Sequence, residues 1–245
     1  MNKLVINRIT AMQTDPLELL QELKGYYSCP KDPATGQRLG PLVGYAGKDK
    51  QGRHYVGDTY ANFAKAEPYP FVLEVWAEML KDRIRDLGVD VFLGMPMGSI
   101  YWSMALARTY CTQCSFAEKK VTKAGSATER EEATLVLGRH EILPGQKVVI
   151  CEDVVNNFST TAEAIHLIKE SQGVPLAIVA LLNRSVPQQK ALLDLPVYAL
   201  VEKEIQQYEQ DDPFVARDVA KNNVVWKVKP EWHRLDAAMK AHANK

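Results

Sequence analysis

Over the first ninety residues, two segments of the chain place hydrophobic side chains at helical spacing, and a turn-rich stretch lies between them. Residues 17–23 form a short helical pattern, and residues 28–40 form a turn-rich stretch with two prolines and two glycines, which indicates a surface loop. Residues 71–87 carry apolar side chains at helical spacing after Pro70, a residue that suits the first turn of a helix. This pattern predicts an amphipathic helix that ends at Gly88.

Beyond Gly88 the pattern changes to short apolar runs that alternate with helical segments. The predicted order is strand 89–93, helix 100–110, strand 147–151, helix 159–170, strand 176–182 and strand 197–201. Strands that are apolar on both faces and alternate with helices are typical of a parallel sheet covered on both sides. Right-handed crossovers then predict an α/β fold with a doubly wound parallel sheet.

The same pattern divides the chain into three predicted regions. Residues 70–205 form the α/β core, and residues 1–69 form an irregular N-terminal region. Residues 206–245 form a C-terminal extension, and the prolines and tryptophans of this tail predict that it packs over the sheet as an appended segment.

Composition and charge narrow the class of protein. A chain of 245 residues with 46% hydrophobic residues can bury a sizeable core without metal or disulfide crosslinks. Because 30 basic residues balance 30 acidic ones, we expect no nucleic-acid or membrane partner. The apolar runs are much shorter than the ~20 residues that span a bilayer. The N-terminus also lacks the pattern of a signal peptide, which predicts a cytoplasmic protein.

The four cysteines, Cys29, Cys111, Cys114 and Cys151, are too few and too scattered for a disulfide framework. Cys111 and Cys114 form a CxxC motif, which can be half of a zinc site or a redox pair. Because the sequence contains no second CxxC or HxxxH motif, we expect reduced structural thiols.

Ligands of an open parallel sheet bind beyond the carboxyl ends of its strands. The segment 94–100 joins a predicted strand to a helix, where its glycines allow close backbone approach and the helix start offers free amides to an anion. Met97, Gly98 and Ser99 are the candidate residues of this loop. From the residues alone, an ordinary strand-to-helix turn without a ligand remains an alternative.

A second strand end carries two adjacent acids, Glu152 and Asp153. Unpaired carboxylates are costly to bury, so these two require a partner such as the vicinal hydroxyls of a ribose. Ser159, Thr160 and Thr161 begin the following helix, where hydroxyls and backbone amides can hold a phosphate. The alternative is that Ser159 only caps the helix and the acids face solvent.

The segment 148–161 resembles the signature of the type I phosphoribosyltransferases. That signature is an apolar strand, two acids, two apolar residues and a loop that receives the 5′-phosphate of phosphoribosyl pyrophosphate. Within the family, the chain is most similar to the orotate phosphoribosyltransferases, and the resemblance covers residues 48–201. It is carried by Lys50-Gln51-Gly52-Arg53, by Tyr60-Ala61-Asn62-Phe63, by residues 91–100 and by Leu181-Leu182-Asn183-Arg184.

The resemblance implies the activity and the partners. Residues 1–69 would form a hood that recognises the base, the substrates would be phosphoribosyl pyrophosphate and a nucleobase such as orotate, and the cofactor would be Mg²⁺. A homodimer is implied as well. Glu152 and Asp153 would be catalytic residues that hold the ribose hydroxyls. The implied substrate-binding residues are Asn156, Asn157, Ser159, Thr160, Thr161, Met97, Gly98, Ser99, Lys50, Arg53, Phe63 and Arg184.

A basic segment, residues 119–128, contains three lysines, a glycine and no acid. In the family, such a loop closes over pyrophosphate and reaches the site of the neighbouring subunit. The resemblance therefore implies catalytic roles for Lys119, Lys120 and Lys123. From the residues alone, a solvated surface loop is the alternative.

The chain departs from the family pattern in two places. Asn156-Asn157-Phe158 stands where the family has Thr-Thr-Gly, so an aromatic residue replaces a glycine. The loop at Met97-Gly98-Ser99 lacks the lysine that bacterial orotate enzymes often carry. These departures leave open a purine or xanthine acceptor, a regulator that binds phosphoribosyl pyrophosphate without turning it over, and an unrelated doubly wound domain.

Overall fold

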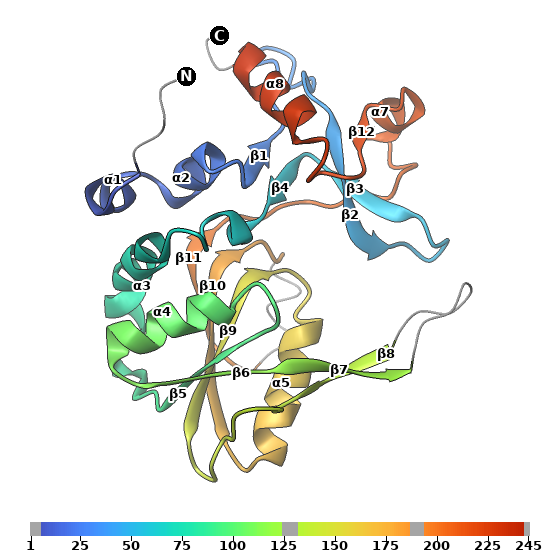
Figure 1. The fold of residues 1–245 in the computed structure, drawn as a ribbon. Coiled ribbons are helices and arrows are strands. Elements are labelled where there is room, and N and C mark those ends of the chain that lie inside the picture. The colour runs from blue at the N-terminus through green and yellow to red at the C-terminus, as the bar shows by residue number, and fades with distance from the viewer. Residues whose placement is uncertain (1–5, 124–131, 187–193, 243–245) are drawn as a thin grey trace. The chain divides into compact units, whose positions relative to one another are not determined.

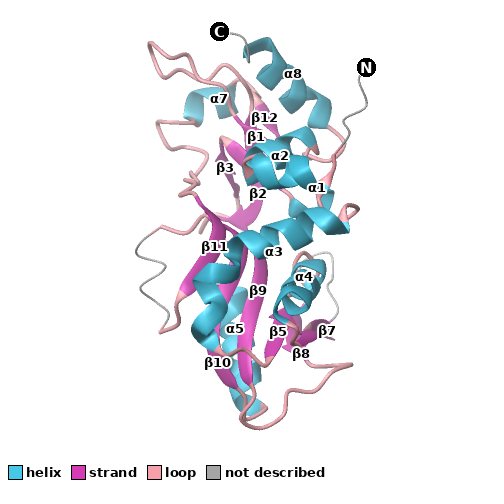
Figure 2. Ribbon diagram, turned by 90° about the vertical axis from the view of Figure 1, so that its left-hand side faces the viewer, coloured by secondary structure: helices cyan, strands magenta, loops and turns pink. Residues whose placement is uncertain are grey.

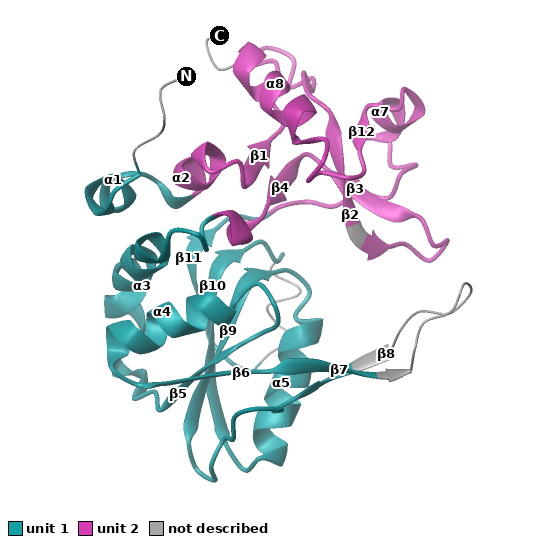
Figure 3. Cartoon of the chain, viewed as in Figure 1, with its two compact units in different colours: residues 1–16, 66–204 teal, residues 17–65, 205–245 magenta. Residues whose placement is uncertain are grey.

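The computed structural model describes residues 6–123, 132–186 and 194–242, with the side chains at 46, 122–123 and 132–133 outside that description. The chain divides into two compact units (Figure 3). Unit 1 contains residues 1–16 and 66–204, and unit 2 contains residues 17–65 and 205–245. Over the described ranges, no helix is both long enough and apolar enough to cross a membrane.

Unit 1 is built on a five-stranded parallel sheet with the strand order β11-β10-β9-β5-β6 (Figure 1). All four neighbouring pairs of strands are parallel. This arrangement confirms the predicted doubly wound α/β fold. The strands are β5 (Val91–Gly94), β6 (Gln113–Phe116), β9 (Lys147–Val155), β10 (Val174–Asn183) and β11 (Val197–Glu202).

Helices cover both faces of this sheet. α3 and α4 lie together over one face, and α5 lies over the other (Figures 1 and 2). Successive side chains of β5 point to opposite faces of the sheet and contact different helices. Leu93 belongs to the apolar cluster of Ile168 in α5, whereas the ring of Phe92 lies 5.4 Å from that of Tyr110 in α4. The helices of unit 1 are α1 (Arg8–Gln13), α3 (Pro70–Ile84), the 3₁₀ helix η2 (Arg85–Leu87), α4 (Ile100–Tyr110) and α5 (Ser159–Glu170).

The helix boundaries follow from local sequence. Pro70 occupies the first position of α3, where its missing N–H leaves no hydrogen bond unmade. Gly88 adopts a left-handed conformation with φ 61° after η2, and this conformation ends the helical segment. The bounds of α4 and α5 coincide with the predicted helices 100–110 and 159–170.

Two parts of unit 1 differ from the sequence prediction. The basic segment does not begin as a loop, because residues up to Lys123 form β7 (Glu118–Lys123), which pairs in antiparallel fashion with β8 (Glu132–Val136). Residues 124–128 of that predicted loop lie outside the described ranges. β9 is longer than predicted, since Glu152 and Val154 continue the parallel ladder with β10. The two adjacent acids therefore lie in the last part of the strand.

Unit 2 combines residues from both ends of the chain, which differs from the predicted division into a region 1–69 and a separate extension 206–245. β12 pairs in parallel with β2, and Val225 and Leu235 share an apolar core with Tyr27 and Val43. The two segments each have a small apolar face, and each buries the face of the other. The elements are α2 (Pro16–Glu22), β1 (Tyr26–Ser28), β2 (Leu42–Lys48), β3 (His54–Gly57), β4 (Thr59–Ala61), η1 (Phe63–Lys65), α7 (Ala216–Ala220), β12 (Val224–Val225) and α8 (Trp232–His242).

Candidate active site

The candidate site lies at the carboxyl end of the parallel sheet of unit 1, where the strand order reverses. From β5 the chain passes through α4 to β6 on one side, and then to β9, β10 and β11 on the other. β5 and β9 are therefore neighbours, with Gly94 paired to Cys151. Ligands of open α/β sheets bind at such a reversal. The loop 95–99 leaves the sheet after β5, and residues 152–161 comprise the last part of β9 and the loop and helix start that follow it.

The loop after β5 is fixed by Ser99, which is 1% exposed. Its Oγ accepts a hydrogen bond from the N–H of Met95 at 2.6 Å. The same oxygen lies 2.8 Å from the carbonyl oxygen of Met95 and 2.6 Å from that of Cys151 in β9. The sequence predicts Ser99 as a ligand-binding residue, whereas the structure engages its hydroxyl with the backbone and makes it a tie between the loop and β9.

Gly98 brings this loop against Asp153. A Cβ atom at position 98 would lie 2.2 Å from Asp153 Oδ2 and 2.6 Å from its Cγ, so the contact requires a glycine. The neighbouring Met97 is 78% exposed, and the Pro96–Met97 peptide is cis. The predicted loop and the predicted acid pair, which are far apart in the sequence, therefore form one site.

Glu152 and Asp153 are partly buried at the end of β9. Burial and, to a lesser extent, the charge of Asp153 raise the pKa of Glu152 to about 8, while Lys119 opposes the shift. Burial also raises the pKa of Asp153, although its Oδ1 accepts a hydrogen bond from the N–H of Val154 at 2.8 Å, which acts in the opposite direction. A cation or a set of hydroxyl donors would stabilise the charged form of both groups.

Glu67 is a third carboxylate at this site, and the sequence analysis does not single it out. It lies in the irregular segment before α3, where burial raises its pKa and the charge of Asp153 adds to the shift. The charge of Asp153 therefore acts on Glu67 as well as on Glu152. Glu67 belongs to no apolar or polar pattern, so only the folded chain identifies it.

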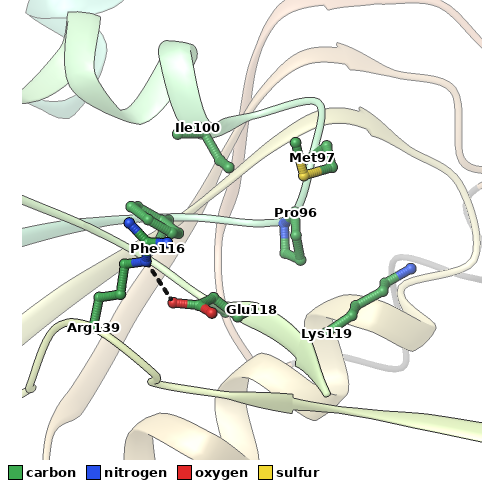
Figure 4. Close-up of a pocket in the computed structure, with 8 residues that line it drawn as sticks. Pro96, Met97, Ile100, Phe116, Glu118, Lys119 and Arg139 are labelled. Carbon is green, nitrogen blue, oxygen red and sulfur yellow. Dashed lines mark ion pairs between the residues drawn. The ribbon is translucent and has the colours of Figure 1, made fainter. Parts of the chain in front are cut away.

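Lys119 of β7 lies near both the acid pair and the loop after β5. Its charge acts on Glu152, and its side chain lines a cavity of about 540 Å³ together with Pro96 and Met97 (Figure 4). One lysine of the basic segment thus lies beside both candidate strand ends. A cation at this position suits a phosphorylated ligand.

The remaining wall of the cavity comes from β6 and from the strands that follow it. Glu118 forms an ion pair with Arg139 at 3.5 Å, which Figure 4 shows beside the ring of Phe116. Lys120 is exposed on β7, and strand alternation turns it to the face opposite Lys119. Lys123 ends the same strand, and its side chain lies outside the described part of the chain.

The loop between β9 and α5 has a left-handed backbone at Phe158, with φ 60° and ψ 13°. This is the conformation that a glycine adopts without strain, and for other residues it costs about 1–2 kcal/mol. The ring of Phe158 belongs to the apolar cluster of Ile168 and is 5% exposed, so burial offsets that cost. Asn157 Oδ1 accepts hydrogen bonds from the N–H of Ser159 at 3.3 Å and from its hydroxyl at 3.0 Å.

The first turn of α5 provides an anion-binding geometry. Ser159, Thr160 and Thr161 occupy this turn, and first-turn N–H groups have no acceptor within their own helix. They also lie at the positive end of the helix dipole. Thr161 is buried, Thr160 and Asn156 are half-buried, and Ser159 is exposed.

Arg184 lies at the next strand end along the sheet. It follows β10, and its N–H donates a hydrogen bond to the carbonyl oxygen of Val155 at 2.9 Å. Its backbone therefore adjoins the end of β9, immediately before the loop of Asn156 and Asn157. The side chain is half-buried.

The other three predicted site residues belong to unit 2. Arg53 Nε lies 2.8 Å from Asp49 Oδ2, and its Nη2 lies 3.0 Å from Asp211 Oδ2, so two carboxylates hold the guanidinium. Lys50 is exposed in the turn between β2 and β3. Phe63 is 1% exposed, and its ring offers no open face to a stacked base.

The carboxylates of unit 1 fit a cation that shares its ligands with a substrate. In the described ranges, no group of three or more acidic, His or Cys side chains is arranged to hold a metal ion. Mg²⁺ commonly binds through one or two carboxylates together with substrate oxygens and water. Glu152 and Asp153 are oxygen ligands whose charged forms a cation would stabilise.

Comparison with known proteins agrees with this geometry. Residues 69–213 match the profile of the phosphoribosyl transferase domain. An orotate phosphoribosyltransferase of Caldicellulosiruptor saccharolyticus is 30% identical over 154 residues, which are 62% of this chain and 74% of that protein.

Two solved structures share the fold. The orotate phosphoribosyltransferase of Aeropyrum pernix superposes with a TM-score of 0.52 and 12% identity, covering 76% of this chain and 92% of its own. The adenine phosphoribosyltransferase of Rhodothermus marinus gives a TM-score of 0.50 and 16% identity, covering 79% of this chain and 99% of its own.

Proposed function

The chain belongs to the phosphoribosyl transferase domain family, and from that premise we propose that it transfers the phosphoribosyl group of phosphoribosyl pyrophosphate to orotate. The observation that carries the proposal is the meeting of three features at one strand reversal. These are the Gly98 loop, the Glu152 and Asp153 pair, and the first turn of α5. The curated relatives named orotate phosphoribosyltransferase support orotate as the acceptor.

The acid pair stabilises the reacting sugar. Loss of pyrophosphate develops positive charge on the ribose, so groups that favour this charge lower the barrier. Glu152 and Asp153 accept hydrogen bonds from the ribose hydroxyls and present negative charge to the ring. Because Gly98 contacts the Asp153 carboxylate, the loop after β5 fixes the orientation of this group.

The first turn of α5 binds the 5′-phosphate. The N–H groups of Thr160 and Thr161 and the hydroxyl of Thr160 supply donors, and Asn157 orders Ser159 through two hydrogen bonds. Phe158 keeps the left-handed backbone of the loop and anchors it in the core. The loop therefore retains its backbone conformation despite the loss of glycine, which favours a functional phosphate site over a relic.

The leaving pyrophosphate faces positive charge. Mg²⁺, when bound with the substrate, neutralises the phosphate oxygens as negative charge develops on them. Lys119 adds a cation beside Met97 and the acid pair, which suits the departing group. Lys120 and Lys123 belong to the same basic strand. We infer that the protein forms a homodimer in which these lysines bind the pyrophosphate at the site of the neighbouring subunit. Light scattering after gel filtration measures whether the dimer forms.

Lys50 supplies positive charge that a carboxylate-bearing base requires, and Arg53 lies three residues further along the chain. Lys50 is exposed, whereas Arg53 is held by Asp49 and Asp211. A neutral purine needs no such cation, whereas the carboxylate of orotate does. If Lys50 binds the base, Lys50→Ala is expected to raise the KM for orotate more than the KM for phosphoribosyl pyrophosphate. An equal change in both constants would contradict this role.

A spectrophotometric screen tests the proposal. Phosphoribosyl pyrophosphate and Mg²⁺ are combined in turn with orotate, xanthine, hypoxanthine, guanine, adenine and uracil, and we expect turnover with orotate. Turnover with a purine alone would replace the acceptor, and binding of phosphoribosyl pyrophosphate without any turnover would indicate a regulator. Asp153→Asn should lower the activity to a small residual rate, whereas the matched control Asp86→Asn, at an exposed acid of the same unit, should retain full activity.

A further inference from the structure

Unit 2 contains a pocket of about 370 Å³ that no residue assigned to phosphoribosyl transfer lines. Its walls come from the segment after α2, from β4 and η1, and from the segment between β12 and α8 together with the start of α8. Basic and aromatic side chains dominate this lining. The basic residues are Lys24, Lys65, Lys229 and His233, and the aromatic residues are Tyr60 and Trp232.

The lysines give this pocket a positive charge. Lys24, Lys65 and Lys229 are exposed, and over the described ranges no carboxylate lies within 4.0 Å of their ammonium groups. Asp236, the acid of the lining, is 2.6 Å from the Nζ of Lys240 and is neutralised by it. Three like charges without partners around one cavity repel one another, so an anion that enters stabilises all three.

The aromatic walls are rigid. The rings of Tyr60 and Trp232 lie 6.3 Å apart at an interplanar angle of 55°, and both pack against the core around Tyr27 and Leu235. The indole N–H of Trp232 is buried and has no hydrogen-bond acceptor among the described residues. A buried donor without an acceptor is unfavourable by about 1–3 kcal/mol, so the pocket contribution of Trp232 is its ring and not this N–H.

The start of α8 adds a second set of donors. Trp232 and His233 are the first two residues of this eleven-residue helix, and both line the pocket. The free N–H groups of a first turn, with the positive end of the helix dipole, favour a phosphate nearby. The pocket thus offers flat apolar walls for a ring and cations for a phosphate.

We propose that this pocket of unit 2 binds a nucleoside monophosphate through residues other than those that we assign to phosphoribosyl transfer. The base lies against Tyr60 and Trp232, and the phosphate lies among Lys24, Lys65 and Lys229. The volume suits one small ligand. One cavity with three lysines on a chain of zero net charge favours a mononucleotide over a nucleic-acid strand, which needs cations along several successive phosphates.

Calorimetry with UMP and AMP tests the proposal on the full chain. The double variant Lys65→Glu with Lys229→Glu reverses charge at two exposed positions, and we expect it to raise the Kd of the better nucleotide about tenfold or more. The matched control Lys221→Glu reverses an exposed lysine of unit 2 that does not line the pocket, and we expect its Kd to stay within about twofold of the parent value.

Two further measurements separate the ring from the phosphate. Trp232 is the tryptophan among the lining residues of this pocket, and Trp232→Phe keeps an aromatic wall while it removes the fluorescent indole. We therefore expect bound UMP to quench tryptophan fluorescence in the parent but not in this variant. Uridine and inorganic phosphate, used singly, should each bind more weakly than UMP. Equal affinity of uridine and UMP would overturn the assignment of the lysines to a phosphate.

The outcomes also distinguish this site from the transfer reaction. A Kd that is unchanged in the double variant, or nucleotide binding that phosphoribosyl pyrophosphate displaces completely, would overturn the proposal. A twelve-nucleotide single-stranded RNA that binds more tightly than either mononucleotide would replace it with a nucleic-acid site. If no base is turned over, the comparison between the double variant and Lys221→Glu still decides the question, because it does not depend on catalysis.

Discussion

Replacing Gly98 by alanine tests whether the loop after β5 positions Asp153. The added Cβ atom would lie 2.2 Å from Asp153 Oδ2, and real Cβ atoms keep at least 3.0 Å, so the carboxylate must retreat by about 0.8 Å. A displacement of about 1 Å at a reacting group can lower the rate about a hundredfold, which corresponds to about 2.7 kcal/mol. We therefore expect Gly98→Ala to lower kcat/KM about a hundredfold.

Initial rates with phosphoribosyl pyrophosphate and orotate measure this effect. The matched control is Gly47→Ala in β2, where the new Cβ would lie 3.3 Å from the ring of Tyr55 and requires only a small adjustment. We expect this control to keep kcat/KM within about twofold of the parent.

A double-mutant cycle shows whether Gly98 acts through Asp153. In an Asp153→Asn background, the carboxylate that the alanine displaces is already neutral and impaired, so adding Gly98→Ala should cost less than about threefold. The reasoning is refuted if Gly98→Ala alone keeps full activity. It is equally refuted if the alanine costs a hundredfold in both backgrounds, because the loop would then act independently of Asp153.

Three other substitutions follow from the same geometry. Phe158→Gly should destabilise the fold by about 1 kcal/mol less than Phe158→Ala in urea denaturation, because only glycine adopts the left-handed backbone without strain. A larger loss of unfolding free energy in the glycine variant than in the alanine variant would contradict this prediction. Ser99→Ala should lower the free energy of unfolding by about 1–3 kcal/mol in the same assay, since it removes the tie between Met95 and Cys151, and an unchanged value would argue against the tie. Because the pKa of Glu152 is raised from 4.5 to about 8, the folded state holds more protons than the unfolded state between these values, and stability falls as pH rises through this window. Glu152→Gln should flatten that slope in thermal unfolding from pH 5 to 8, and an unaltered slope would assign it to other groups.

The sequence predicts the parts of this molecule that depend on local patterns. The helices 100–110 and 159–170 are marked by apolar spacing and by the turns that precede them, and the structure has the same bounds. The acid pair and the loop at Gly98 were identifiable because each follows an apolar strand. The sequence places both at the carboxyl ends of parallel strands, whereas the contact between Gly98 and Asp153 comes from the structure alone.

The remaining features depend on contacts between distant residues. Glu67 lies in an irregular segment, and no spacing relates it to Asp153. Phe63 illustrates the opposite case, because its aromatic ring suggests stacking on a base, whereas the folded chain buries it. Ser99 has the residue type of a ligand donor and the geometry of a structural tie. Residue type alone does not distinguish these roles.

The tail raises the same difficulty on a larger scale. Its two tryptophans and two prolines suggest an appended segment, but nothing local indicates that Val225 will pack beside Val43. Each of the two short segments has an incomplete apolar face, and the hydrophobic pattern of either segment alone does not predict a core. Their pairing became evident only when both ends of the chain were folded together.

The composition of unit 2 from residues 17–65 and 205–245 has a consequence for the order of folding during synthesis. Most of unit 1 is one continuous stretch, so its sheet can assemble while the ribosome is still adding the tail. The ladder between β2 and β12 joins Leu42 to Val224 and closes a very long loop, which makes it a slow step of high contact order. The apolar face of β2 therefore stays without its partner until the last forty residues emerge. We therefore expect residues 17–65 to expose apolar surface on the nascent chain after the sheet of unit 1 has formed.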